Sequence, residues 1–300
     1  MNDFIKLLKN NGIYYEENID LKKYSTYKTG GKARVLIKPS SKDELIKALT
    51  YIKKNYLRYF IVGNGSNLIF PDEDFNGVII SLKNLNKVTY MFNGFVKVEA
   101  GASLVKLALE TVKKGFSGLE FAVGIPASLG GAIYMNAGAY KSDMSKVVSK
   151  VTVLTPDFKI IEMVKSELQF SYRSSFFLNH KDYIILDALL LFKKGDIKEM
   201  LDLVEDRRRR RLEAQPLSYP SAGSVFRNLE DTPAWKVIDS LGLKGKTIGG
   251  AKISEKHGNF IINYNNASSN DIIKLIKLVQ DEAYNKKGIK LINEQIIVKW

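Results

Sequence analysis

The most informative stretch of this sequence is Gly124-Ile125-Pro126-Ala127-Ser128-Leu129-Gly130-Gly131-Ala132-Ile133-Tyr134-Met135-Asn136-Ala137-Gly138-Ala139-Tyr140. It is rich in glycine and alanine and carries no charged residue. Side chains this small let the backbone approach another group closely, and successive N–H groups in such a segment can point at one anion. A buried packing segment has the same composition, so this stretch alone leaves packing and ligand binding open.

A second glycine loop favours ligand binding. A short strand is predicted over residues 58–62, and it runs directly into Gly63-Asn64-Gly65-Ser66-Asn67-Leu68. This loop offers backbone and hydroxyl donors that suit a diphosphate. It departs from the dinucleotide fingerprint G-x-G-x-x-G, because Leu68 stands where the third glycine belongs. A Rossmann fold is therefore not predicted.

Composition limits the class of protein. The chain has 300 residues, of which 45% are hydrophobic, enough for about two or three domains with a core. No run approaches the about 20 apolar residues of a membrane span, and residues 1–11 lack the apolar centre of a signal peptide. The chain has no cysteine and only two histidines, which excludes thiolate chemistry and argues against a multi-histidine metal site. We therefore expect a cytoplasmic protein without a metal.

The formal charge of +14 raises the question of nucleic-acid binding. Most of the lysines are scattered singly, and the one dense cluster is Arg207-Arg208-Arg209-Arg210-Arg211, which follows a helix predicted over 196–206. Cations after the last turn of a helix complement its dipole. A solvated face is therefore the first interpretation of this run, ahead of binding to a small-molecule phosphate and of binding to a nucleic acid.

Hydrophobic periodicity predicts a mixed α+β chain. Residues 41–44 read as a capping box that opens an amphipathic helix, and a second helix is predicted over 101–114 and closed by Gly115. A loop over 215–220 separates a second compact unit. Strands are predicted over 33–38, 77–82, 96–99, 150–155, 159–163, 183–192, 251–254, 260–263 and 290–299, and further helices over 233–241 and 271–287. The strands over 150–155 and 159–163 flank Pro156-Asp157-Phe158 and are predicted to form a hairpin, and Gly288 is predicted to stop the last helix.

Other motifs complete a pattern that spans nearly the whole chain. They are Tyr172-Arg173, then Gln215-Pro216 followed by Gly223-Ser224-Val225-Phe226, and then Gly249-Gly250-Ala251 followed by Lys256-His257-Gly258-Asn259-Phe260. Together with the two glycine loops, and in this order, they resemble the UDP-N-acetylenolpyruvoylglucosamine reductase family. The short spacing after Tyr172-Arg173 is similar to the subgroup that lacks an extra tyrosine-bearing substrate loop.

The resemblance implies a domain organisation. It implies a two-subdomain FAD-binding fold of the vanillyl-alcohol-oxidase or PCMH-like type, with subdomains over 1–84 and 85–212. A C-terminal α+β substrate-binding domain would follow over 213–300. We expect a monomer that binds no nucleic acid.

The resemblance also implies an enzyme of peptidoglycan precursor synthesis. Such an enzyme holds FAD noncovalently and uses NADPH to reduce UDP-N-acetylglucosamine enolpyruvate to UDP-N-acetylmuramate. By motif position, Arg173, Ser224 and Glu294 are implied to be catalytic, and Tyr172 and Asn228 to bind substrate. The implied FAD-binding residues are Gly63, Asn64, Gly65, Ser66, Asn67, Gly101, Gly124, Ser128, Gly131, Asn136 and Gly138.

The three implied catalytic side chains suit this chemistry. Reducing an enolpyruvyl ether drives negative charge into its carboxylate, and Arg173 offers a permanent positive charge with paired donors. A bare carboxylate would repel that charge, so we expect Glu294 to act as a protonated acid. Ser224 is the expected proton donor to the neighbouring carbon. Taken singly, each residue also fits a structural role: a buttressing arginine, an exposed strand glutamate and a turn serine.

Three segments depart from the family pattern. Ala127 stands at a common glycine position, Ser25-Thr26-Tyr27 replaces a common Asn-Thr-Phe, and the chain ends in Val298-Lys299-Trp300 instead of a Gly-Glu tail. None of them removes an implied catalytic group. Two other functions stay open at this point: an FAD-dependent oxidase of the same fold, and a basic nucleic-acid-binding protein.

Overall fold

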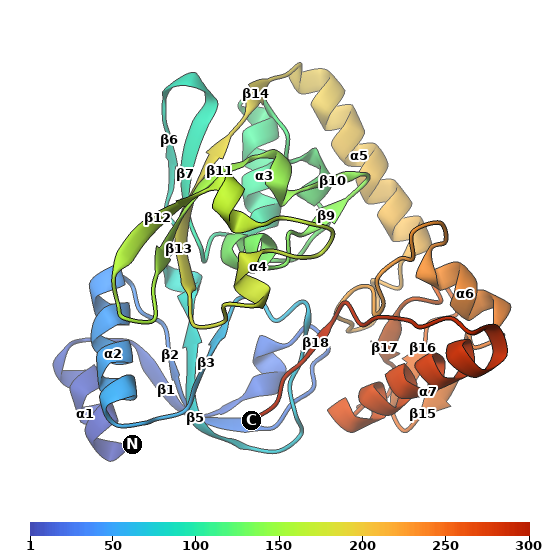
Figure 1. Ribbon diagram of the computed structural model, residues 1–300, viewed down its shortest axis with the longest axis horizontal. Coiled ribbons are helices and arrows are strands. Elements are labelled where there is room, and N and C mark those ends of the chain that lie inside the picture. The colour runs from blue at the N-terminus through green and yellow to red at the C-terminus, as the bar shows by residue number, and fades with distance from the viewer. The chain divides into compact units, whose positions relative to one another are not determined.

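The computed structural model describes residues 1–300 and divides into two compact units. The first unit comprises residues 1–16, 35–63 and 77–209, and the second comprises 17–34, 64–76 and 210–300. Figure 1 labels the helices and strands of both units. The family-derived boundaries at 84/85 and 212/213 stay a prediction.

Strands from residues 15–81 form a four-stranded sheet. Its order is β1 (Tyr15–Asp20), β2 (Lys32–Ile37), β5 (Phe75–Ser81), β3 (Tyr59–Val62), and β3 runs parallel to β5. Helices α1 (Asn2–Asn10) and α2 (Lys42–Lys54) share one hydrophobic core with β2 and β5. The predicted helix start at Ser41 is confirmed, because Ser41 Oγ accepts the Glu44 N–H at 3.1 Å and so satisfies a donor in the first turn of α2. The predicted capping box is incomplete, because the Glu44 side chain accepts the Ser40 N–H at 2.7 Å and not the Ser41 N–H.

The larger sheet of the first unit is antiparallel. Its order is β12 (Ile160–Val164), β11 (Val148–Leu154), β13 (Ile184–Leu191), β7 (Phe95–Glu99), β6 (Val88–Tyr90). The predicted hairpin is confirmed as β11 and β12, and the long apolar run at 183–192 is confirmed as the central strand β13. Helices α3 (Leu104–Lys113) and α4 (Leu129–Tyr134) bury their apolar residues in the same core.

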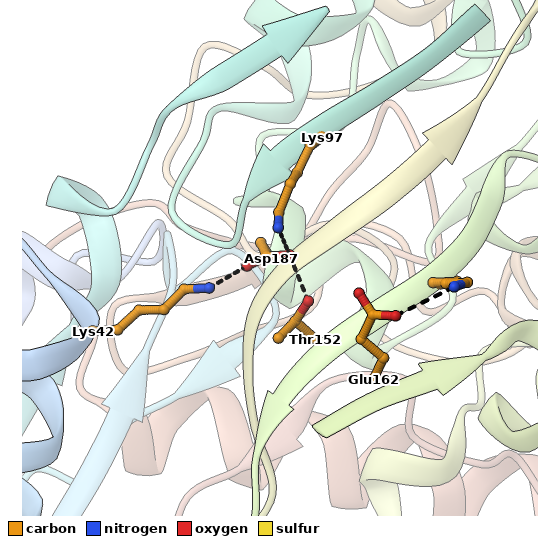
Figure 2. Close-up of polar contacts among 6 residues, drawn as sticks. Lys42, Lys97, Thr152, Glu162 and Asp187 are labelled. Carbon is orange, nitrogen blue, oxygen red and sulfur yellow. Dashed lines mark hydrogen bonds and ion pairs between the residues drawn. The ribbon is translucent and has the colours of Figure 1, made fainter. Parts of the chain in front are cut away.

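A buried carboxylate ties α2 to this sheet. Asp187, on β13, is only 2% exposed, and Figure 2 shows Lys42, Lys97 and Thr152 around it. Lys42 Nζ lies 2.5 Å from Oδ2, and Thr152 Oγ1 donates to Oδ1 at 2.7 Å. Lys97 Nζ lies farther away, at 3.7 Å from Oδ1. Because a buried carboxylate needs such partners, this cluster fixes the start of α2 against the sheet.

Helix α5 corrects one prediction. It runs over Ile197–Ala214, so the arginine run lies inside its last turns and does not follow a helix that ends at residue 206. Arginine is a good helix former, and Asp206 pairs with Arg209 one turn later at 2.7 Å. Arg207 lies over the ring of Tyr140 at 5.1 Å, and the Tyr140 hydroxyl donates to its carbonyl at 3.1 Å. Part of the run is therefore packed against protein.

The second unit holds a small antiparallel sheet with two helices. Strands β15 (Thr247–Ile248), β16 (Ala251–Ile253) and β17 (Ile261–Asn263) pair in that order. Helices α6 (Ala234–Ser240) and α7 (Ser269–Lys287) share its core. The predicted end of α7 is confirmed, because Gly288 closes it with a φ of 65°. None of the helices in the protein is both long and apolar enough to cross a bilayer.

The C-terminal segment differs from the predicted strand over 290–299. Only Ile296–Ile297 forms a strand, β18, which runs parallel to β4 (Leu68–Ile69). Upstream of it, the side chain of Gln280 binds the Leu291 carbonyl at 3.0 Å and so replaces ladder pairing. The unusual terminal residue Trp300 stacks on Phe75 with ring centroids 4.2 Å apart, which anchors the end of the chain.

Candidate active site

The first glycine-rich stretch forms α4 and the turns around it. Ser128 caps the helix, because its Oγ accepts the Gly131 N–H at 3.3 Å. The N–H groups of Leu129 and Gly130 donate to the carbonyls of Ala102 and Ala100 at 2.9 and 2.8 Å. The first donors of α4 are therefore used within the protein, and Gly131 is the exposed residue of this turn.

Several glycines that are predicted to bind FAD are also required by packing. A Cβ on Gly63 would overlap Ser128 Oγ, so the two glycine loops meet at this point of the first unit. A Cβ on Gly101 would overlap the Leu82 carbonyl, and one on Gly138 the Ser142 carbonyl. Gly124, for its part, lies half-buried in the turn before Pro126.

The loop that follows β3 keeps backbone donors available. Gly65 is buried with a φ of 65°, and an added Cβ would overlap the Tyr24 carbonyl. Its carbonyl accepts the Thr26 N–H at 3.3 Å. The N–H groups of Gly65 and Ser66 donate no hydrogen bond within the protein. Gly65 is buried and Ser66 is half-buried, and buried backbone donors are nearly always paired, so these two unpaired N–H groups fit an anionic ligand. Asn64, between Gly63 and Gly65, is half-buried.

Sequence reasoning missed a buried hydroxyl beside this loop. Ser81 ends β5 and lies in register opposite Val62, the residue before Gly63. Its side chain is fully buried, and its Oγ has no hydrogen-bond partner in the protein. A serine at the end of a hydrophobic strand carries no distinctive signal in one sequence. The strand register is what reveals its place.

Arg173 lies in a strained turn within the first unit. It adopts a φ of 54°, in the left-handed region that side chains other than glycine rarely occupy. Ser171 and Ser174 exchange two backbone hydrogen bonds of 3.1 Å across the turn. The guanidinium of Arg173 lies 5.1 Å from the ring centroid of Tyr172, which is about half exposed.

Asn136 holds this turn in place. It is 1% exposed, its side-chain amide donates to the Ser171 carbonyl at 2.9 Å, and its Oδ1 accepts the Ser145 N–H at 3.0 Å. On the other side of the turn, Ser175 Oγ donates to the Tyr134 carbonyl at 2.6 Å. Residues of the glycine-rich stretch therefore position Arg173, and contact of Asn136 with FAD stays a prediction.

Ser224 and Glu294 lie on neighbouring segments of the second unit. The Glu294 N–H donates to the Val225 carbonyl at 2.8 Å, and Phe226 pairs with Asn293 in an isolated antiparallel bridge. The Asn67 side chain donates to the Glu294 carbonyl at 3.1 Å, and the Asn67 carbonyl accepts the Ile296 N–H at 2.9 Å. The second glycine loop therefore holds the segment that carries Glu294.

Asn259 fixes the segment that follows Ser224. Its Oδ1 accepts the Phe226 N–H at 2.9 Å, and its Nδ2 donates to the Phe226 carbonyl at 2.8 Å. Its own N–H donates to Nδ1 of His257 at 3.2 Å, which gives that histidine a structural role. Asn228, a predicted substrate residue, accepts the Ala234 N–H at 3.1 Å and so caps α6.

Two further residues escaped sequence reasoning. Gln295 is 3% exposed and lies directly after Glu294, and Tyr27 is completely buried. The Tyr27 hydroxyl donates to Gln295 Oε1 at 3.0 Å. The only signal that the sequence gives for this pair is a glutamine directly before the apolar run Ile296-Ile297-Val298.

Comparison with known proteins defines the family. The UDP-N-acetylenolpyruvoylglucosamine reductase of Caldanaerobacter subterraneus subsp. tengcongensis is 42% identical over 293 residues, covering 98% of this chain and 96% of that one. This chain belongs to the UDP-N-acetylenolpyruvoylglucosamine reductase family. The reductase of Anoxybacillus flavithermus is 41% identical over 98% of this chain and 97% of its own.

Family descriptions and structures agree with this assignment. The family described as FAD binding domain matches residues 33–163, and the C-terminal domain of UDP-N-acetylenolpyruvoylglucosamine reductase matches 215–298. The crystal structure of that reductase from Thermus caldophilus has a TM-score of 0.80 and 33% identity, covering 96% of this chain and 99% of that one. A glucose dehydrogenase, Phl p 4.0202, has a TM-score of 0.50 at 13% identity, covering 65% of this chain and 44% of that one, and shows the fold alone.

The α+β prediction with a PCMH-like FAD-binding domain is therefore confirmed. Members of the UDP-N-acetylenolpyruvoylglucosamine reductase family are FAD-dependent oxidoreductases, and so is this chain. The residues present suit that cofactor, because the Gly65 and Ser66 N–H groups are unused and their own loop, residues 63–68, carries no charged side chain. Family membership favours the reductase over the oxidase and the nucleic-acid-binding protein.

Proposed function

We propose that this enzyme reduces the enolpyruvyl ether of UDP-N-acetylglucosamine enolpyruvate to UDP-N-acetylmuramate with NADPH as reductant, in peptidoglycan precursor synthesis. One feature of the structure supports this most. A residue of each glycine loop forms a hydrogen bond to a segment with a proposed catalytic residue. Asn136 binds the turn of Arg173, and Asn67 binds the backbone of Glu294. Loops that only bound a nucleotide would not need these bonds.

FAD, when bound without a covalent link, would supply hydride transfer between NADPH and the substrate. Backbone donors at Gly65 and Ser66, in the loop that follows β3, would hold its diphosphate. The remaining predicted contacts, from Asn64, Gly101, Gly124, Gly131 and Gly138, are proposed on family position. Ser81 is added because its buried hydroxyl lacks a partner.

Arg173 would stabilise the charge that reduction creates. Hydride addition to the methylene carbon of the enolpyruvyl group moves the electron pair of the double bond toward the carboxylate. The guanidinium offers paired donors to those oxygens and cannot lose its charge. The Asn136 and Ser175 side chains hold the turn that carries Arg173, so its backbone needs little reorganisation during the reaction. Such a donor typically contributes about 3–4 kcal/mol to the transition state.

Ser224 and Glu294 would complete the addition. Ser224 would give its hydroxyl proton to the carbon next to the carboxylate, so that one hydride and one proton have been added across the double bond. Glu294, in its acid form, would donate a hydrogen bond to the charged carboxylate. The bond between the Glu294 N–H and the Val225 carbonyl keeps both segments together. Tyr172 and Asn228 are proposed substrate contacts.

The test is an anaerobic experiment in two stages. NADPH is added to the FAD-loaded enzyme and the flavin absorbance is followed until it bleaches. UDP-N-acetylglucosamine enolpyruvate is then added, and the absorbance should return while UDP-N-acetylmuramate forms in equal amount. Return of colour only on admitting oxygen would contradict the proposal and support the oxidase. The subgroup without the extra substrate loop, the monomeric state and the cytoplasmic location remain predictions.

A further inference from the structure

We propose that Tyr27 and Gln295 are positioning residues that set Ser224 and Glu294 in one fixed arrangement. The inference rests on the proposed function, because it concerns the proton transfer assigned there to Ser224. It is carried by a buried hydrogen-bond network within the second unit that joins the segments of Tyr27, Ser224 and Glu294.

The side chain of Gln295 is the centre of this network. Its Nε2 donates to the carbonyls of Ala222 and Gly223, each at 3.1 Å, and its Oε1 accepts from the Tyr27 hydroxyl at 3.0 Å. Both N–H groups and the oxygen of the amide are thus used. A rotated amide would turn its oxygen toward two carbonyl oxygens, so only one orientation satisfies the network. A buried network with every member paired is rigid.

The network acts on both proposed catalytic residues at once. Gln295 is the residue that follows Glu294 in the chain. Its side chain binds the carbonyls of the two residues directly before Ser224. Gly223 has a φ of 74°, so the chain turns sharply at the point where Gln295 holds it. On the other side of Ser224, the Glu294 N–H donates to the Val225 carbonyl at 2.8 Å. Ser224 cannot move relative to Glu294 without breaking one of these bonds.

Tyr27 anchors the far end of the network. Its N–H donates to Ser25 Oγ at 3.2 Å, and its carbonyl accepts from Asn263 Nδ2 at 2.9 Å. Burial raises the pKa of the Tyr27 hydroxyl, which therefore stays a donor to Gln295. A phenylalanine here would fill the same space but leave Gln295 Oε1 buried without a partner. The tyrosine thus orients the amide, and the amide holds the turn before Ser224.

Three variants test this arrangement: Gln295→Met, Tyr27→Phe and the double variant. Methionine keeps the length of glutamine and removes its donors. Stopped-flow absorbance would measure flavin bleaching by NADPH and colour recovery by the enolpyruvyl substrate separately. FAD content and bleaching should be unchanged. Because a small misplacement of a reacting group is costly, recovery should slow by about 10²-fold in Gln295→Met.

Loss of a single hydrogen bond should slow recovery less, by about 3- to 10-fold, in Tyr27→Phe. The double variant should be no slower than Gln295→Met, because Tyr27 acts through Gln295. Ile272→Ala is the control: Ile272 is buried in the same unit and forms none of these bonds, so it should lower thermal stability and leave recovery unchanged.

Recovery at the wild-type rate in Gln295→Met would overturn the inference and leave the proposed function intact. Equal slowing of recovery in Ile272→Ala would show that the network acts only through the stability of the unit, and this result would also overturn the inference. If Gln295→Met does not fold, Tyr27→Phe decides in the same way. A wild-type enzyme whose colour never recovers with the enolpyruvyl substrate would instead refute the proposed function, and the inference with it.

Discussion

The side-chain amide of Asn67 donates a hydrogen bond of 3.1 Å to the backbone carbonyl of Glu294. Asn67 belongs to the second glycine loop, and Glu294 lies 227 residues later in the chain. The same asparagine accepts the Ile296 N–H on its own carbonyl, so it holds the C-terminal segment at two points. A loop residue that the sequence suggests for the cofactor thus also orders a proposed catalytic segment.

Asn67→Ala should therefore lower turnover while retaining most of the bound FAD. Loss of one hydrogen bond should lower the free energy of unfolding by about 1 kcal/mol and turnover by about 3- to 10-fold. Urea unfolding and steady-state kinetics measure the two effects. Asn86→Ala is the matched control, because Asn86 makes a similar bond to the Lys83 carbonyl on the exposed surface. Equal turnover in both variants would remove Asn67 from the positioning of Glu294.

Gly65→Asp should abolish FAD binding. The substitution places a Cβ against the Tyr24 carbonyl and a negative charge beside the proposed diphosphate. The matched control is Gly12→Asp, because Gly12 has a φ of 66° and no atom within 4 Å of an added Cβ. Both variants carry the same backbone strain, and only the first should lose the flavin absorbance after gel filtration. Full FAD occupancy in Gly65→Asp would refute the assignment of this loop.

Asn136→Ala should disturb the turn of Arg173. It removes a donor to the Ser171 carbonyl and one of two acceptors of the Ser145 N–H, which also donates to Asp143 Oδ1 at 3.0 Å; both lost bonds are partly buried. The expected loss in free energy of unfolding is about 2 kcal/mol or more, with a fall in turnover. Asn136→Asp keeps an acceptor for the Ser145 N–H, loses the donor to Ser171 and adds a negative charge at a site that is 1% exposed. If turnover in Asn136→Asp matched the wild type, the Ser171 bond would not be what positions Arg173.

Stability should fall in mildly acidic solution because of His257. Burial lowers the pKa of this imidazole below its ordinary value of 6.5, and neutral Nδ1 accepts the Asn259 N–H. The unfolded chain then binds more protons than the folded one as the pH falls through 6.5 toward the lower folded pKa. The free energy of unfolding therefore decreases across that interval and levels off below it.

Thermal unfolding of His257→Gln across this interval checks the prediction. The variant should be less stable than the wild type near neutral pH and should show a weaker pH dependence. His180→Gln, at the other histidine, controls for the loss of an imidazole. An unchanged pH dependence in His257→Gln would show that other groups cause the acid sensitivity.

The sequence predicted those features that local patterns encode. The capping signal at Ser41, the hairpin of β11 and β12 and the glycine stop of α7 all follow from short-range chemistry. The end of α5 differs from the prediction because five successive arginines look like a boundary in the sequence, although arginine continues a helix well. The predicted C-terminal strand is longer than the observed one. Some apolar residues near 291–297, such as Leu291, are buried by packing, and only Ile296–Ile297 forms a strand.

The site shows the same division. Motif order leads to the proposal of Arg173, Ser224 and Glu294, but it does not predict the side chains that hold their segments. Gln295, Ser81 and the positioning role of Asn136 depend on contacts between residues far apart in the chain. No local pattern in one sequence reports such contacts.

The central claim is that Ser224 protonates the substrate carbon, and Ser224→Ala tests it most directly. Anaerobic stopped-flow absorbance would follow bleaching of the flavin by NADPH and then recovery of its colour on addition of UDP-N-acetylglucosamine enolpyruvate. Bleaching should proceed at the wild-type rate, because it needs no proton on carbon. Recovery should slow by about 10²- to 10⁴-fold, the usual contribution of a general acid. Recovery at the wild-type rate would contradict the account.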